Sequence, residues 1–288
     1  MSDIFAPIST FTKDPYTVLI NAVPTLMTVT VFGNKSKNFI TKFDVTPETA
    51  MAFEEAIENI FDEKCQAIIF HIFNFKPLGY LHVMKFAYEI RVKLADKKIY
   101  NFFYSGQSLF TSGLLISAKI KSTKNDILFV VRVHGDDRLS IFEYLFTDAG
   151  YKQIREDMIL KANDEPAHDL RKKILKGTKP KHIIVYCENG ELPIMKKLKK
   201  NVFTNEKIHR LDKNILKESI VQTLKITKYV RDRSIVKYHV IPKCAKHFAV
   251  YFENREEAFF TAKVGENVPF TKEDYAVRDA VNISVSYV

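Results

Sequence analysis

The chain has 288 residues, 46% of them hydrophobic, which is enough for one large core or two modest ones. Its three cysteines show no CxxC or Cys/His spacing, which argues against a disulfide framework and a zinc site. No signal peptide is visible, and no apolar run approaches the roughly 20 residues of a membrane helix, so we expect a cytoplasmic protein without a membrane partner.

The net charge of +10 is unevenly distributed along the chain. Basic and acidic residues balance at 16 each in residues 1–150 and at 7 each in residues 234–288, whereas residues 151–233 carry 21 basic and 11 acidic residues. This asymmetry indicates contact with an acidic partner, such as nucleic acid or the ribosome. A solvated, lysine-rich helical surface would have the same composition.

The first part of the chain predicts three short strands and a helix. Residues 16–21, 28–32 and 38–43 are rich in β-branched and aromatic side chains, and Gly33-Asn34 is a turn between the second and third strands. Thr46-Pro47-Glu48 is typical of a helix start with Thr as the N-cap, and apolar residues at helical spacing continue to about residue 62. A buried strand at 67–73, a helix at 78–94 and a strand at 99–103 follow.

The middle of the chain predicts a buried hairpin. Residues 105–113 are expected to form a loop or short helix, and residues 114–120 to pair with the hairpin. Residues 127–133 are an apolar strand, His134-Gly135-Asp136-Asp137 is a turn, and a second strand runs to about residue 145. Such a turn could cradle a phosphate or be plain architecture, and as a metal site it lacks a distant third ligand.

The last part alternates helices and strands before a β-rich tail. Residues 151–165 show no clear pattern. A basic helix at 166–176, a strand at 183–186, a loop at 187–190, a helix at 191–200 and a longer helix from Asp212 follow. Short strands are expected around 236–241, 248–252, 258–264 and 281–287. These elements predict an α/β body with a β appendage, and no internal repeat is visible.

The order of these segments resembles the heat-shock protein 70 (DnaK-type) chaperone family in a shortened form. Residues 127–141 are similar to the family's VLIFDLGGGTFDVSI, and residues 183–198 to LVLVGGSTRIPKVQKL. Residues 16–39 look like a segment with the hairpin V-x-V-x-Y-K-G-E, and residues 235–238 stand in the place of the interdomain linker. Val268-Pro269 and Thr271-Lys272 look like the opening of the substrate-binding β-subdomain.

The resemblance implies an α/β, two-lobed actin-like ATPase (ribonuclease H-like) fold, reduced in size, with a partial β-rich C-terminal appendage. Lobe I is expected at 1–126 and lobe II at 127–233. A linker and a partial substrate-binding-like β-subdomain are expected at 234–288.

The resemblance also implies a degenerate nucleotide site. The family's first phosphate loop, DLGTT, has no counterpart before Tyr16, and the Asp of its second loop, DLGGGT, is matched by Val131. A carboxylate of the motif NEPTAAA is matched by Tyr104. The remnants of the binding loops are His134, Gly135 and Asp136 for phosphate, and Glu188, Asn189 and Gly190 for adenosine. We therefore expect no catalytic residue, no metal and no cofactor, with residual ATP binding as the alternative.

Other polar groups predict binding rather than catalysis. Ser105 and Ser108 lack an identifiable His/Asp pair, and His71 in an apolar strand is expected to be a core or interface residue. Nine lysines could form one basic face toward phosphates: Lys172, Lys173, Lys176, Lys179, Lys181, Lys196, Lys197, Lys199 and Lys200.

The sequence thus predicts a non-catalytic pseudo-chaperone that acts as a scaffold or co-chaperone. Its expected partner is a chaperone, a J-domain protein or the ribosome. The alternatives are an RNA- or ribosome-binding factor that uses the basic face of 151–233, and a residual ATP-binding chaperone. The sequence leaves the oligomeric state open.

Overall fold

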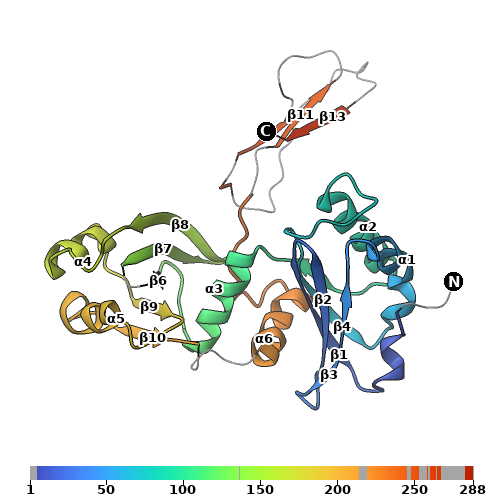
Figure 1. Ribbon diagram of the computed structural model, residues 1–288, viewed down its shortest axis with the longest axis horizontal. Coiled ribbons are helices and arrows are strands. Elements are labelled where there is room, and N and C mark those ends of the chain that lie inside the picture. The colour runs from blue at the N-terminus through green and yellow to red at the C-terminus, as the bar shows by residue number, and fades with distance from the viewer. Residues whose placement is uncertain are drawn as a thin grey trace. The chain divides into compact units, whose positions relative to one another are not determined.

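The chain divides into two compact units, Met1–Val240 and Ile241–Val288. The computed structural model describes residues 5–135, 137–213, 219–244, 248–252, 258, 260–263, 265–266 and 283–287. The first unit contains two five-stranded sheets with helices, and the second contains a three-stranded sheet (Figure 1). The expected α/β body followed by a β-rich appendage is confirmed.

Lobe I is built on the first sheet, whose strand order is β3-β2-β1-β4-β5. Central β1 pairs antiparallel with β2 and parallel with β4, and β5 continues the parallel edge. Helices α1 and α2 bury their apolar stripes against one face of this sheet. The elements are the short 3₁₀ turn η1 (Ile8–Thr10), β1 (Tyr16–Val23), β2 (Leu26–Gly33), β3 (Phe39–Val45), α1 (Ala50–Ile60), β4 (Cys65–His71), α2 (Val83–Asp96) and β5 (Asn101–Phe103).

Lobe II repeats this topology on the second sheet, whose order is β10-β9-β6-β7-β8. Central β6 pairs antiparallel with β7 and parallel with β9, as β1 does with β2 and β4. The elements are β6 (Ile127–His134), β7 (Arg138–Thr147), β8 (Gly150–Ile159), α4 (Ala167–Leu175), β9 (His182–Cys187), α5 (Pro193–Lys197), the π-helical turn η2 (Leu198–Val202) and β10 (Ile208–Leu211). The structure therefore contains an internal repeat that the sequence does not reveal.

Two helices join the lobes, because each follows a strand of one lobe and packs against the sheet of the other. α3 (Gly106–Ser117) follows β5, yet its Leu114 and Leu115 pack against the lobe II sheet. α6 (Ser219–Arg231) follows β10, yet its Ile226 and Val230 pack against the lobe I sheet. α3 and α6 also contact each other, so the inner faces of both sheets are covered by exchanged helices.

The second unit is a small antiparallel sheet. Its order is β12-β11-β13, with bounds β11 (Phe248–Phe252), β12 (Phe260–Ala262) and β13 (Ile283–Tyr287). The similarity noted at Val268–Lys272 falls outside the described residues. None of the helices in the described part of the chain has the length and apolar character needed to cross a membrane.

Several predicted elements were wrong in kind. Residues 114–120, predicted as a strand, belong mainly to α3, and the patternless residues 151–165 contain β8. Residues 236–241 contribute a single bridge, from Val240 to Tyr151, rather than a strand. Helix α1 starts after Thr49 instead of Thr46, whose backbone N–H donates to Thr49 Oγ1 at 2.9 Å.

Candidate functional site

The loops expected to hold a nucleotide lie where the parallel strands of each sheet end. β1, β4 and β5 run in one direction in lobe I, as β6, β9 and β10 do in lobe II. Ligands of α/β sheets bind outside the carboxyl ends of such strands. The β1–β2 turn and the β6–β7 turn are therefore equivalent places in the two lobes.

The β1–β2 turn corrects the prediction that the first phosphate loop has no counterpart. β1 and β2 are the first strand pair of lobe I, so Pro24 and Thr25 occupy the place of that loop. The turn contains no glycine, and the Pro24 carbonyl accepts a hydrogen bond from the Lys76 N–H at 3.1 Å. Pro24 has no N–H of its own, so the turn is poorly equipped to surround a phosphate with backbone donors.

The β6–β7 turn keeps one glycine and uses its polar groups internally. Gly135 has φ +61°, with open space where a Cβ would lie. His134 Nε2 lies 3.0 Å from Ser140 Oγ, and burial, together with Arg132 and Arg138, lowers the pKa of His134. Asp137 accepts hydrogen bonds from the backbone N–H groups of Ala162 and Asn163. Asp136 falls outside the described residues.

Val131 does not face the inner side of the lobe II sheet. It is fully buried on the opposite face, in the core that α4 and α5 share with the sheet. The next residue of β6, Arg132, lies on the inner face, and its guanidinium carbon is 4.5 Å from the centre of the Phe110 ring on α3. The equivalent residue of β1 is Asn21, which is exposed. An arginine cannot replace a carboxylate as a magnesium ligand, so Arg132 argues against a magnesium site on this face of the sheet. The sequence alone did not point to Arg132.

The segment after β5 is structural. Tyr104 is fully buried, and its hydroxyl lies 3.3 Å from His239 Nδ1. Ser105 caps α3, because its Oγ accepts the Ser108 N–H at 3.1 Å. His71 packs so close to Gly106 that a Cβ there would lie 2.8 Å from its Nε2. Burial lowers the pKa of His71, which fits the predicted core or interface role.

The adenosine-loop remnant, residues 188–190, packs against the neighbouring strand β10. The Gly190 carbonyl accepts a hydrogen bond from Arg210 of β10, and a Cβ at Gly190 would lie 2.8 Å from both Arg210 and Asp212. Asn189 Oδ1 accepts the Glu191 N–H at 3.1 Å. The Gly190 carbonyl and the Asn189 side chain are thus engaged within the protein, while Glu188 is exposed. No group of three or more His, Cys, Asp or Glu residues suited to a metal occurs in the described part of the chain.

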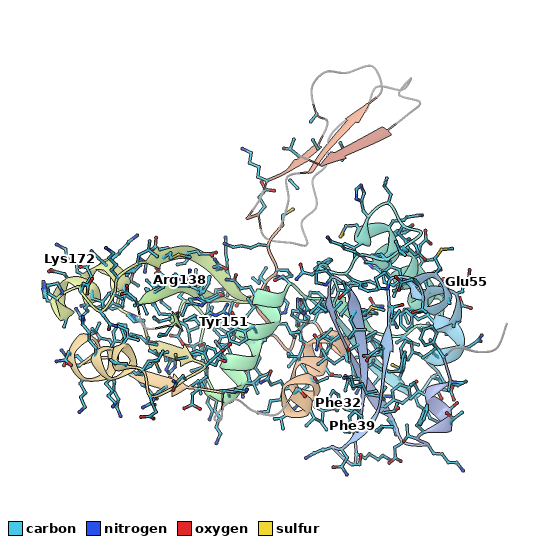
Figure 2. The ribbon with its side chains drawn as sticks, in the orientation of Figure 1. Phe32, Phe39, Glu55, Arg138, Tyr151 and Lys172 are labelled. Carbon is cyan, nitrogen blue, oxygen red and sulfur yellow. The ribbon has the colours of Figure 1, made fainter. Side chains whose placement is uncertain are left out.

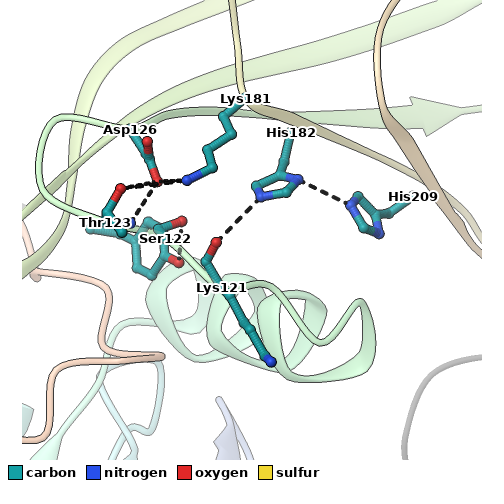
Figure 3. Close-up of polar contacts among 8 residues, drawn as sticks. Lys121, Ser122, Thr123, Asp126, Lys181, His182 and His209 are labelled. Atoms are coloured by element: carbon teal, nitrogen blue, oxygen red, sulfur yellow. Dashed lines mark hydrogen bonds and ion pairs between the residues drawn. The ribbon is translucent and has the colours of Figure 1, made fainter.

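Four of the nine basic-face lysines are held by the protein itself. Lys173 pairs with Glu165, and Lys176 with Asp157 at 2.9 Å. Lys181 turns back to Asp126 at 2.6 Å (Figure 3). The Lys197 ammonium donates to three backbone carbonyls, those of Ala162, Asn163 and Glu165, at 2.6–3.1 Å. Lys197 therefore stabilises a turn and does not belong to an exposed basic surface.

Next to Lys181, two histidines contact each other. His182 Nδ1 lies 3.3 Å from His209 Nε2, and His182 Nε2 lies 3.4 Å from the Lys121 carbonyl (Figure 3). Burial lowers the pKa of both imidazoles. With one ring donating to the other, the pair is occupied internally.

The other five lysines are exposed, and within the described part of the chain none of them forms an ion pair. Figure 2 shows Lys172 on α4. Helix α4, which carries Lys172, and turn η2, which carries Lys199 and Lys200, pack against each other, whereas Lys179 follows α4 and Lys196 belongs to α5. We call them the free lysines: Lys172, Lys179, Lys196, Lys199 and Lys200.

Comparison with known proteins gives likenesses to solved structures only. No family model matches the chain, and no curated protein matches it. A Bacteroides thetaiotaomicron protein of unknown function with an actin-like ATPase fold is 14% identical, over 74% of this chain and 97% of its own, with a TM-score of 0.33. The inorganic polyphosphate/ATP-glucomannokinase of Arthrobacter sp. strain KM is 10% identical over 75% and 99%, with a TM-score of 0.36. The ethanolamine utilization protein EutJ of Carboxydothermus hydrogenoformans is 9% identical over 79% and 91%, with a TM-score of 0.29.

The sheet topology identifies the fold. Both sheets have one central strand, an antiparallel pair of strands on one side and parallel strands on the other. The chain has a reduced, two-lobed actin-like ATPase fold. None of these three structures is described as a heat-shock protein 70, so that finer resemblance stays a prediction from the sequence.

Proposed function

We propose that this protein is a non-catalytic, heat-shock protein 70-like scaffold that uses an actin-like fold to bind another protein. The observation that carries the proposal is the position of Tyr104. The resemblance places a catalytic carboxylate there, yet the tyrosine side chain is fully buried and its hydroxyl contacts His239. It can therefore neither bind magnesium nor orient a water molecule.

The two equivalent turns support the same proposal. Pro24 and Thr25 replace a glycine-rich phosphate loop in lobe I. In lobe II, the polar groups of His134 and Asp137 are engaged within the protein, and Arg132 packs on Phe110. Phosphoryl transfer relies almost wholly on positioning and on preorganised charge, and the described residues at these turns supply neither.

An exposed apolar row at α2 is suited to a protein partner. Leu81, just before the helix, is 88% exposed and Tyr88 is 59% exposed, with Met84 and Val92 on the same side. The opposite side of α2 is already buried in the lobe I core. Contiguous exposed apolar side chains rimmed by charges, here Lys85 paired with Glu89, are typical of interaction sites.

Cross-linking in a cell extract, followed by mass spectrometry, tests the scaffold role. We expect the wild-type chain to be linked to a chaperone, a J-domain protein or a ribosomal protein, and L81S/Y88S to lose that product. F11S is the matched control, because Phe11 is 53% exposed and lies outside α2. Failure to recover any of these three partner classes would reject the proposal.

The free lysines favour a second candidate, RNA or ribosome binding. They are exposed and have no ion pair with the described residues, so they can neutralise phosphates. Each phosphate contact steepens the dependence of affinity on salt by about 0.7–0.9 in log–log slope. K196E/K199E/K200E should abolish ribosomal RNA binding, whereas K13E/K35E/K42E in lobe I, with the same charge change, should not. Equal binding by both variants would exclude this candidate.

A further inference from the structure

A pocket of about 230 Å³ opens on the first unit beside the C-terminal half of α6. One wall comes from α6, a second from residues 235–239 after the helix, and Tyr104 at the end of β5 completes it. The three segments lie far apart in the sequence. Neither phosphate turn contributes to the pocket, so its ligand is independent of the degenerate nucleotide site.

The pocket carries excess positive charge. Lys225 and Lys228 of α6 and Lys237 of the following segment line it, and none of the three forms an ion pair with the residues that the structure describes. The ammonium groups of Lys225 and Lys237 lie 5.7 and 5.2 Å from the centre of the same Tyr238 ring. Asp232, the nearest acid in sequence, accepts hydrogen bonds from the Ser234 N–H and hydroxyl.

The base of the pocket is aromatic and held in place. The His239 ring stacks on Tyr229 with centroids 3.5 Å apart, and the Tyr104 hydroxyl forms a hydrogen bond with Nδ1 of the same imidazole. The Arg233 guanidinium lies 4.7 Å from the Tyr229 centroid and 4.6 Å from that of Phe102, so it adds positive charge beside the pocket. The site is thus preformed, with flat aromatic walls and several cations.

We propose that this pocket binds a small organic anion, in which an aromatic body carries a phosphate or carboxylate group. The lysines supply charge-assisted donors for the oxyanion, and the half-buried Tyr238, beside Lys225 and Lys237, supplies a ring against which an aromatic ligand can pack. Ligand pockets combine apolar walls with a few convergent polar groups in this way. The inference goes beyond the scaffold role and does not depend on it.

Isothermal titration of the full chain with phenyl phosphate, benzoate and phenol tests the proposal. We expect saturable binding of at least one of the two anions, weakened by added salt, and no binding of phenol, which has the ring without the charge. The stronger of the two anions identifies the oxyanion that the pocket prefers. Absence of saturable binding of both anions at millimolar concentration would overturn the proposal.

Two lysine variants locate the binding. K225M and K237M should each weaken binding of the preferred anion about tenfold, because each removes one charged donor. K13M is the matched control, since Lys13 is an exposed lysine of lobe I that does not line the pocket, and it should bind as wild type does. The two variants lie on different segments, so one remains informative if the other fails to fold, as judged by circular dichroism. Unchanged affinity in the folded variants would place the anion elsewhere and contradict the proposal.

Discussion

The buried imidazole of His239 predicts that acid destabilises the protein. His239 is 3% exposed, and burial, reinforced by the charge of Arg233, lowers its pKa from 6.5 to about 3. Tyr104, Tyr229 and Phe102 surround it. The folded protein therefore keeps this ring neutral at pH values where an unfolded chain would protonate it.

The direction and size of the effect follow from this difference. Because the folded pKa lies below the unfolded pKa, the unfolded state binds the extra proton, and stability falls as the pH drops below about 6.5. Between pH 7 and pH 5 this one group should lower the free energy of unfolding by about 2 kcal/mol. The loss should continue down to the folded pKa of about 3.

Urea unfolding of wild type and H239Q at pH 7 and pH 5 measures this contribution. Far-UV circular dichroism suits a chain without tryptophan. The pKa values of His71, His134, His182 and His209 are also lowered, so only the difference between the two proteins isolates His239. H168Q, at a side chain that is 87% exposed, controls for the loss of a histidine. If H239Q loses as much stability as wild type between the two pH values, the reasoning is refuted.

Two further substitutions test packing and hydrogen bonding at the candidate site. K197M should lower the free energy of unfolding by about 1.5–3 kcal/mol, because three carbonyls lose their charged donor, whereas the exposed neighbour K196M should change it by less than about 0.5 kcal/mol. Equal effects of the two in chemical denaturation would contradict the role of Lys197. G106A should destabilise the protein, since its Cβ would lie 2.8 Å from His71 Nε2, and a smaller loss in the H71A background would show the contact in a double-mutant cycle. Additive losses would argue that the contact is unimportant.

The local pattern predicted most strands but not the repeat that relates them. β1 and β6 both stand out as apolar, β-branched runs, and the fold class follows from their order. The repeat is invisible because equivalent positions carry unlike side chains, such as Asn21 in β1 and Arg132 in β6. Topology preserves hydrogen-bonded pairing, which does not depend on side-chain identity.

Two elements were misjudged because tertiary contacts override local pattern. α3 is buried by both lobes, so its apolar run resembles a buried strand, although the capping serine Ser105 marked a helix start. β8 looks too polar for a strand, but its Arg155 is largely buried against Glu143 of β7 at 2.7 Å. A charged residue paired inside a sheet cannot be recognised before its partner is known.

The sequence predicted only part of the candidate site. The missing glycines were visible in the sequence, whereas the roles of Lys197, Arg132 and Tyr104 required the contacts of the fold. The anion pocket joins residue 104 to residues 225–239, a separation that no local motif spans.

We propose that the actin-like fold persists here without its phosphoryl-transfer chemistry. Release of γ-phosphate from Mg·ATP by the purified full chain tests it directly, with an active heat-shock protein 70 as the positive control. The structure predicts no release above the buffer blank, because Tyr104 is buried and the β1–β2 turn is Pro24-Thr25. Release that grows in proportion to protein concentration and saturates with ATP would contradict the claim.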